Sequence, residues 1–256
     1  MKSLIAFTKK EMLSHFRSFK LPVLASVFVL VAVMNVLTAK FTPWLLEAMS
    51  ESLELSGMVI SEVSAKAIDS WVQFFKNLPM CLIAFVIIES NIFTKEYRSG
   101  TLIMSLTKGM QRYKVVLSKL IVLVGFWTVG FWVNFGITYG LTEVLWDDTA
   151  VKNVLFAALL QWIFGLWVTS LIVIFSTVAK SNIVVLAGGA GVIFAVYLIS
   201  MLPKIKEYLP TFLTDGNSLI YGISTPKDYI PAIIITVALT VFCTVLSFLL
   251  FNKKQL

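Results

Sequence analysis

Residues that could bind or catalyse are few in this 256-residue chain, and most of them gather in one stretch. Residues 94–119 read TKEYRSGTLIMSLTKGMQRYKVVLSK, the most charge-dense part of the sequence. Within it, Gly100 and Gly109 bound a short apolar segment that has charges at both ends. Such a segment favours docking onto a partner protein, and a merely solvated loop is the alternative.

Catalytic and cofactor motifs are absent from the sequence. It contains no GxxxxGK[ST] loop to cradle ATP phosphates, no HExxH and no serine-elbow motif. A single histidine, His15, excludes a site with several histidine ligands, and Cys81 and Cys243 lie in apolar runs without partners at metal or redox spacing. We predict that the chain is not an enzyme and binds no metal or other cofactor itself.

A few polar residues fall inside the apolar runs and could line a pathway or a gate. They are Glu89, Asn134, Thr138 and Gln161. An intramembrane carboxylate such as Glu89 is a functional candidate by default, and a plain salt bridge is its alternative role. The neutral residues could equally tie helices together. The apolar runs contain neither paired carboxylates nor a concentrated ring of charge, so the sequence does not indicate an ion channel or an ion-coupled transporter.

The elements that position these residues are predicted to be membrane helices. Hydrophobic residues make up 58% of the chain, charged residues only 14%, and the mean hydropathy is +0.89. A soluble domain would carry roughly 25% charged residues. The apolar runs are also longer than the roughly 9–11 residues of a transmembrane β-strand. We therefore predict an all-α, polytopic membrane protein.

Charge-free runs place six transmembrane helices, at residues 21–39, 77–93, 115–142, 153–179, 181–203 and 229–252. Residues 1–20 are predicted to form an amphipathic helix in the membrane interface. The loop 41–76 is acidic, which would suit a cationic species leaving a pore, and it has helical periodicity. The loop 204–228 is compatible with a re-entrant hairpin.

Glycine spacing predicts close helix packing at two places, Gly136 with Gly140, and the group Gly188, Gly189 and Gly191.

The distribution of basic residues predicts the orientation. Two-thirds of the 21 Lys and Arg residues fall on the side of the N-terminus, among them those of the 94–114 loop, and most acids fall on the other side. By the positive-inside rule, both ends lie in the cytoplasm. The basic net charge therefore reflects the topology in a lipid bilayer, and we expect no nucleic-acid partner.

The segment from Glu96 to Leu102 resembles the E-x-x-x-G-T-L signature of ABC-2 type (type V) ABC transporter permeases. Residues 102–106 match the short helix that follows in that family, and Arg112 and Lys119 stand at its basic positions. Lys10-Glu11 and Arg17-Ser18 look like the family's interfacial elbow helix. The chain departs from the pattern at Lys108-Gly109, where the family usually has a proline.

This resemblance implies a permease subunit of an ATP-driven exporter in the bacterial cytoplasmic membrane. A second permease copy or a sister permease would complete the pore, and separate ABC ATPase subunits would bring ATP and Mg. The residues implied in coupling to the ATPase are Glu96, Tyr97, Arg98, Gly100, Thr101, Leu102 and Leu106, and those of the elbow helix are Lys10, Glu11 and Arg17. The apolar spans favour an amphipathic peptide or drug as cargo. The alternative is a membrane regulator or immunity factor that binds its target without transporting it.

Overall fold

The computed structural model describes residues 2–48, 64–107, 109–147 and 151–254. Within these ranges it contains helices and no strands, which confirms the all-α prediction. The predicted acidic and helical segment at 49–63 lies outside the described residues.

Six of the described helices are long and apolar enough to cross a membrane, as predicted. They are α2 (Lys20–Ala48), α4 (Ala67–Glu89), α7 (Arg112–Leu145), α8 (Val154–Val178), α9 (Asn182–Ile199) and α12 (Ile230–Lys253).

Helix α2 extends beyond the span predicted at 21–39, and α4 begins before the span predicted at 77–93 and ends within it, at Glu89. The absence of charge predicts that these spans stop at Lys40 and Lys76, but both helices continue through these lysines, to Ala48 in α2 and back to Ala67 in α4. A lysine at the edge of a bilayer directs its ammonium group toward water while its stem stays along the helix. Charge therefore marks where the apolar region ends and does not mark where the helix ends.

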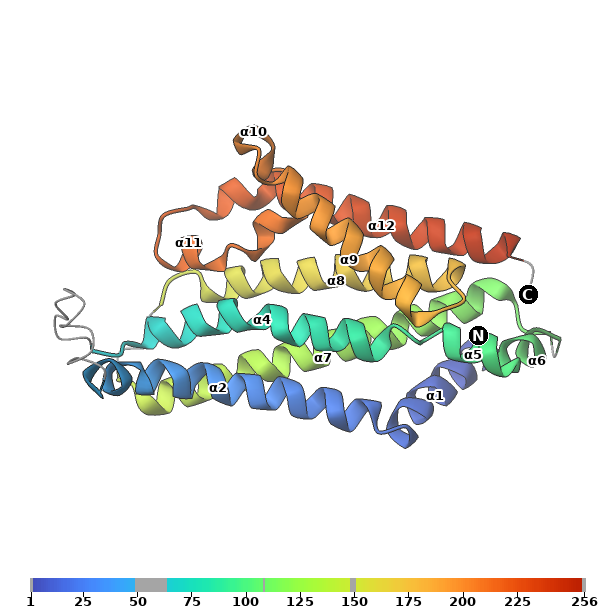
Figure 1. The fold of residues 1–256 in the computed structure, drawn as a ribbon, viewed down its shortest axis with the longest axis horizontal. Helices are drawn as coiled ribbons and strands as arrows, with labels where there is room; N and C mark the ends of the chain where they lie inside the picture. Colours follow the sequence, from blue (N-terminus) through green and yellow to red (C-terminus); the bar gives the residue numbers. More distant parts are fainter. Residues whose placement is uncertain (1, 49–63, 108, 148–150, 255–256) are drawn as a thin grey trace.

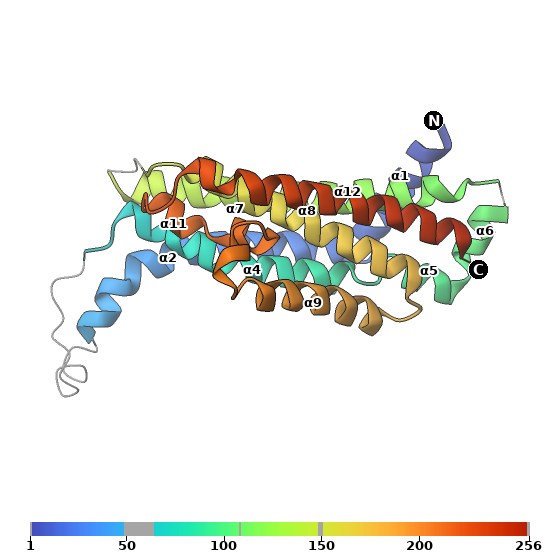
Figure 2. The ribbon, with the colours of Figure 1, turned by 90° about the horizontal axis from the view of Figure 1, so that it is seen from above.

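The six long helices run along one common direction, with α8 in the interior (Figures 1 and 2). Two-thirds of the apolar window of α8 is buried, against 11% for α9, which lies at the periphery. Both chain ends lie at the same end of the bundle as the short helices α5 and α6 (Figure 1). We call this the α5/α6 end; α11 lies toward the opposite end.

Helix α1 (Lys2–Arg17) lies across the α5/α6 end and packs on α7 and α2. Its inward face carries Phe7, Glu11 and His15, all buried, while Ile5 and Phe16 are more than half exposed. An apolar face that remains exposed on a membrane protein suits the lipid interface. The face that packs on the bundle is therefore partly charged.

The segment predicted as the loop 204–228 is folded against the bundle. It contains the short helices α10 (Pro203–Lys206), η1 (Pro210–Thr214), α11 (Gly216–Ile220) and η2 (Pro226–Tyr229). Elements η1 and α11 pack on α8, and Leu213 and Leu219 are fully buried. The Tyr229 hydroxyl donates to the Asp215 carbonyl at 2.8 Å. Prolines and glycines thus divide this segment into short turns that cover one end of α8.

The glycines that pack closely are mostly not the predicted ones. A Cβ on Gly136, Gly140, Gly189 or Gly191 would meet nothing within 4 Å, so the prediction of close packing at these glycines is wrong within the chain. Of the predicted glycines only Gly188 packs closely: a Cβ there would lie 2.5 Å from the Phe175 ring. The tightest approach is instead at Gly165, where a Cβ would lie 2.1 Å from the Trp127 indole. Aromatic rings inserted between helices, rather than helix backbones in contact, demand glycine here.

Candidate functional site

Helices α5 (Thr94–Ser99) and α6 (Thr101–Thr107) form a short helix pair at one end of the bundle (Figure 1). The chain turns between them at Gly100, with φ of 67°, and turns again after α6 at Gly109, with φ of 86°. Side chains with a Cβ rarely adopt these angles, whereas glycine does so without strain. The two glycines of the sequence motif therefore set the shape of this helix pair.

The side chains of α6 divide between the core and the surface. Leu102 is 1% exposed and belongs to the hydrophobic core, and Leu106 is half-buried against it. Ile103 and Met104 are 47% and 57% exposed. Neighbours on a helix point about 100° apart, so Leu102 and Ile103 cannot face the same partner. The exposed apolar surface of α6 therefore consists of Ile103 and Met104, and Leu102 anchors the helix.

Glu96 is held by two lysines from distant parts of the chain. Its carboxylate lies 2.9 Å from the Lys119 ammonium of α7 and 2.9 Å from the Lys10 ammonium of α1. Burial alone would lower the pKa of Lys10, but the hydrogen bond and attraction from Glu96 outweigh it and raise that pKa above its ordinary value of 10.5. The Lys10–Glu96 pair therefore stays charged throughout the neutral range.

Lys119 is the most buried charge of the group, with 0% of the residue exposed. Besides Glu96, its ammonium lies 3.0 Å from the Glu11 carboxylate and donates to the Ile92 carbonyl at 2.8 Å. A buried charge is tolerated only when ion pairs and hydrogen bonds compensate for the lost water. Lys119 meets this requirement by joining α1, α5 and α7.

Glu89 extends the same network toward α2. It is 1% exposed, accepts from His15 Nε2 at 2.9 Å and lies 3.7 Å from the Lys20 ammonium. Lys20 also donates to the Asn91 carboxamide. Glu89 thus forms a salt bridge at the α5/α6 end, which is the structural alternative considered for it.

We refer to this set as the charge network: Lys10, Glu11, His15, Lys20, Glu89, Glu96 and Lys119.

The other candidate coupling residues lie at the surface of this end. The Tyr97 hydroxyl donates to the Thr177 carbonyl at 3.2 Å. Arg98 and Thr101 are exposed, and the Thr101 hydroxyl lies 2.8 Å from that of Ser99. Arg17, at the end of α1, is exposed and makes no ion pair with any described residue.

Arg112 fixes the start of α7 to the end of α12. Its Nη1 donates to the carbonyls of Phe251 and Asn252, each at 3.1 Å, and to that of Lys254 at 2.6 Å. The last carbonyls of a helix lack partners and carry partial negative charge, so a guanidinium is well placed there. The α5–α6 pair is itself connected by polar contacts to α1 and α7 through Glu96 and to α8 through Tyr97, and Arg112 connects α7 to the end of α12.

Asn134 and Thr138 are fully buried between helices. The Asn134 amide donates to the Phe28 carbonyl of α2 at 2.7 Å. The Thr138 hydroxyl accepts a hydrogen bond from the side-chain amide of Asn35. The side-chain oxygen of Asn35 in turn accepts a hydrogen bond from the side-chain amide of Asn77 at 3.0 Å. These contacts tie α2, α4 and α7 together and do not line a cavity.

A similar contact joins Ser70 and Thr142, whose hydroxyls are 2.7 Å apart. We refer to Asn35, Ser70, Asn77, Thr138 and Thr142 as the amide–hydroxyl cluster.

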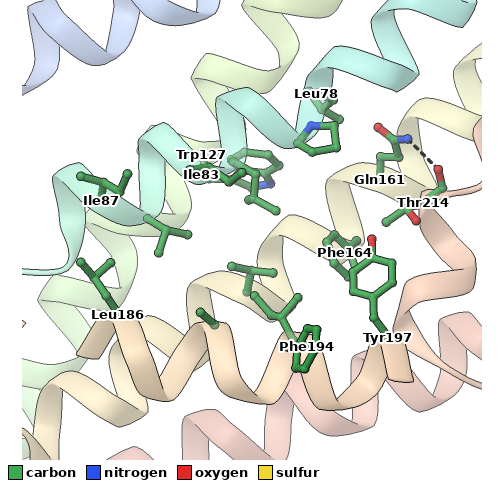
Figure 3. A pocket seen from close by; sticks show the side chains of 16 residues that line it. Leu78, Ile83, Ile87, Trp127, Gln161, Phe164, Leu186, Phe194, Tyr197 and Thr214 are labelled. Atoms are coloured by element: carbon green, nitrogen blue, oxygen red, sulfur yellow. Dashed lines mark hydrogen bonds between the residues drawn. The ribbon is translucent and has the colours of Figure 1, made fainter. Parts of the chain in front are cut away.

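Gln161 is the one pathway candidate that lines a groove. Its Nε2 donates to the Thr214 carbonyl at 3.1 Å, and its Oε1 has no hydrogen-bond partner. The groove has a volume of about 470 Å³ and lies between α4, α8 and α9. Figure 3 shows Gln161 and Thr214 at one end of it, and Ile87 and Leu186 at the other. Apart from Gln161, Thr214 and Tyr197, its walls are apolar.

Sequence reasoning missed the role of His15 and Lys20. Their partner Glu89 lies about 70 residues further along the chain, so no local pattern relates them. A signal was nevertheless available: at 100° per residue, His15 falls within the apolar sector of this helix and Glu11 falls at its edge, where a side facing lipid would carry apolar residues. Among the described residues, no three His, Cys, Asp or Glu side chains gather as a metal site would require.

The comparison with protein families agrees with this architecture. A family model described as "ABC-2 family transporter protein" matches residues 5–256. No curated protein matches the chain. The match extends over all six long helices, α1 and the α5–α6 pair. The chain therefore belongs to the ABC-2 family of transporter proteins, as a membrane component of an ABC transporter.

Proposed function

We propose that the chain is the permease subunit of an ATP-driven exporter. A second permease, either another copy or a sister chain, completes the transmembrane pathway, and separate ABC ATPase subunits bind at the α5/α6 end. This end and both termini then lie in the cytoplasm, as the distribution of basic residues predicts. ATP and Mg are bound by the ATPase chains.

The α5–α6 pair carries this proposal. It presents Ile103 and Met104 as an exposed apolar tip, while Glu96 and Leu102 fasten it to the rest of the protein. A tip that merely bound a partner would need no such fastening. Because Glu96 pairs with the half-exposed Lys10 of α1 and with the buried Lys119 of α7, a force applied at the tip is passed to both of these helices. This is what coupling ATPase closure to a change in the pathway requires.

The groove between α4, α8 and α9 is the surface that we assign to the cargo. Helix α9 is the least buried of the long helices, so this side of the bundle is open to a second permease or to lipid. Apolar walls with one amide, Gln161, suit an amphipathic peptide or drug-like molecule entering from the bilayer.

The proposal is tested by co-expressing the chain with the stand-alone ABC ATPases of its source organism and purifying the complex in nanodiscs. We expect stable association and vanadate-sensitive ATP hydrolysis. The double variant Ile103→Asp/Met104→Asp should lose association, because charges would replace the apolar tip. Ile223→Asp is the matched control: it is 78% exposed, and it lies just beyond α11.

Association of the double variant as tight as that of the wild-type chain would overturn the assignment of the tip. If the folded wild-type chain binds no ATPase at all, the non-transporting regulator or immunity factor becomes the better function.

A further inference from the structure

A polar pocket opens at the α5/α6 end, beside the α5–α6 pair. It has a volume of about 380 Å³ and is lined by Asn91, Lys95, Arg98, Ser99 and Asn182. These residues come from the turn after α4, from α5 and from the first turn of α9. No carboxylate is among the lining residues.

The two nearest acidic residues in sequence are turned into the charge network. Glu96 pairs with Lys119 and Lys10, and Glu89 pairs with His15 and Lys20. Among the described residues, neither Lys95 nor Arg98 has a carboxylate within salt-bridge distance; both side chains are exposed. The pocket therefore holds two positive charges that the protein itself does not neutralise.

Hydrogen-bond donors dominate the rest of the pocket. The side-chain oxygen of Asn91 accepts a hydrogen bond from Lys20, and the side-chain oxygen of Asn182 accepts one from the Thr94 hydroxyl. Their amide NH₂ groups thus remain to face a ligand. Asn182 also begins α9, an 18-residue helix whose N-cap residue makes no side-chain hydrogen bond to the first turn. The open N–H groups of that turn add partial positive charge.

The apolar groove assigned to the cargo begins next to this pocket. Ile87 of the groove lies four residues before Asn91, and Leu186 lies four residues after Asn182. Within α9, one helical turn of about 5–6 Å separates Asn182 from Leu186, and Asn91 lies in the turn just beyond the end of α4. Figure 3 shows Ile87 and Leu186 facing one another at the end of the groove. A cationic, donor-rich pocket therefore lies next to the end of a groove with apolar walls, where α4 ends and α9 begins.

We infer that the pocket and the groove form one binding site for an anionic amphiphile, with a phosphate or carboxylate head against Lys95 and Arg98 and an acyl-like tail between α4 and α9. This rests on the proposed function, which assigns the groove to the cargo. It narrows the cargo from an amphipathic molecule in general to one with a negative head. It also differs from the cationic cargo that the acidic loop 41–76 would suit; residues 49–63 of that loop lie outside the described residues.

Charge complementarity favours this occupant over a bare apolar molecule. A drug or lipid without a negative head would leave Lys95, Arg98 and the amide donors facing only water, with no gain from binding. A phosphate or carboxylate accepts several charge-assisted hydrogen bonds at once. Burial of the apolar tail in the groove is favourable because it removes apolar surface from water.

The test uses the wild-type chain alone, without ATPase, in nanodiscs of zwitterionic lipid. The probe is lysophosphatidic acid with a brominated acyl chain, which quenches the fluorescence of Trp127 in the groove wall. Quenching in a Trp127→Phe variant gives the background from the other tryptophans. We expect saturable quenching, and binding about tenfold weaker for each cation removed in Lys95→Gln and Arg98→Gln.

Three comparisons make this test specific. Lys9→Gln, which removes an exposed charge from α1, should bind like the wild-type chain. Ala190→Phe, which fills the groove without adding a tryptophan, should weaken binding of the probe. A trimethylammonium amphiphile with the same brominated chain should bind at least about tenfold more weakly than the phosphate probe.

Equal affinity for the two head groups, or no effect of Lys95→Gln and Arg98→Gln, would overturn the inference. Inorganic phosphate that competes at the same concentration as the probe would show that the groove takes no part. If these variants bind the probe normally but lose the ATPase, Lys95 and Arg98 belong to subunit docking and only the inference fails. If the wild-type chain binds the probe but no ATPase, the proposed function fails and the site remains.

Discussion

The same three helices, α2, α4 and α7, are joined by polar side chains at two levels of the bundle, in different ways. At the α5/α6 end the charge network joins them by way of α1, whose His15 pairs with Glu89 of α4 and whose Glu11 pairs with the buried Lys119 of α7 at 3.0 Å. Lys20 of α2 also lies 3.7 Å from Glu89. Further along, the amide–hydroxyl cluster joins them through neutral contacts such as Ser70–Thr142 at 2.7 Å. The distances are alike, but the consequences of losing a partner are not.

Position along the helices accounts for this difference in part: Lys20 and Glu89 stand at the ends of α2 and α4, whereas Asn35 and Asn77 lie near the middle of these helices. A charge at the centre of a bilayer costs about 2.5–3.5 kcal/mol or more, whereas amides and hydroxyls are tolerated there. A neutral contact between membrane helices contributes only about 0.6 kcal/mol on average, since each group finds other partners in the unfolded state. The charge network therefore fixes the geometry near the proposed ATPase contact, and the amide–hydroxyl cluster leaves the helices freer to shift beyond it.

The largest expected effect is at Lys119. Lys119→Met leaves Glu11 without its buried partner and removes one of the two cations from Glu96. Breaking a buried pair from one side costs about 3–5 kcal/mol, because the remaining charge is uncompensated. The measurement is equilibrium unfolding in mixed micelles titrated with sodium dodecyl sulfate.

The matched control is Lys152→Met, at an exposed lysine that makes no ion pair with a described residue. Equal unfolding midpoints for the two variants would contradict the claim that the charge network fixes this end.

A smaller effect is expected in the amide–hydroxyl cluster. Asn35→Leu removes the hydrogen bonds to Asn77 and Thr138 while keeping a similar volume. We expect a loss of about 1 kcal/mol, near the upper range for neutral contacts between membrane helices. The same unfolding titration measures it. A loss as large as that of Lys119→Met would remove the distinction between the two regions.

The smallest effect should occur within the charge network itself, at its exposed edge. Lys10 and Lys119 both lie 2.9 Å from Glu96, but the side chain of Lys10 is 49% exposed and that of Lys119 is 1% exposed. Double-mutant cycles with Lys10→Met, Lys119→Met and Glu96→Gln separate the two coupling energies. We expect less than about 1 kcal/mol for Lys10–Glu96 and clearly more for Lys119–Glu96. Equal values would mean that burial does not govern these pairs.

Sequence reasoning succeeded where local composition decides the outcome. Six apolar runs predicted six long helices, because a helix in lipid satisfies its own backbone and needs only apolar side chains. Gly100 and Gly109 were recognised as the limits of a short helix, and both have positive φ. The family was also identified, from the motif between Glu96 and Leu102 together with topology and length.

It failed where the outcome depends on which helix lies opposite. The spacing of Gly136 and Gly140 predicted close packing, yet both face open space, while Gly165 meets an indole that its own sequence neighbourhood does not reveal. Ser70 and Thr142 were not selected at all, since a hydroxyl in a helix usually bonds its own backbone.

The sequence by itself determined that this protein is a six-helix ABC-2 membrane component with a glycine-bounded helix pair, because hydropathy and glycine torsions act locally. Only the tertiary structure decided that Glu96 points to Lys10 and Lys119 rather than to a partner, and that Lys95 and Arg98 are left without a carboxylate. Ion pairing depends on distances across helices that lie far apart in the chain. These distances exist only once the helices have packed.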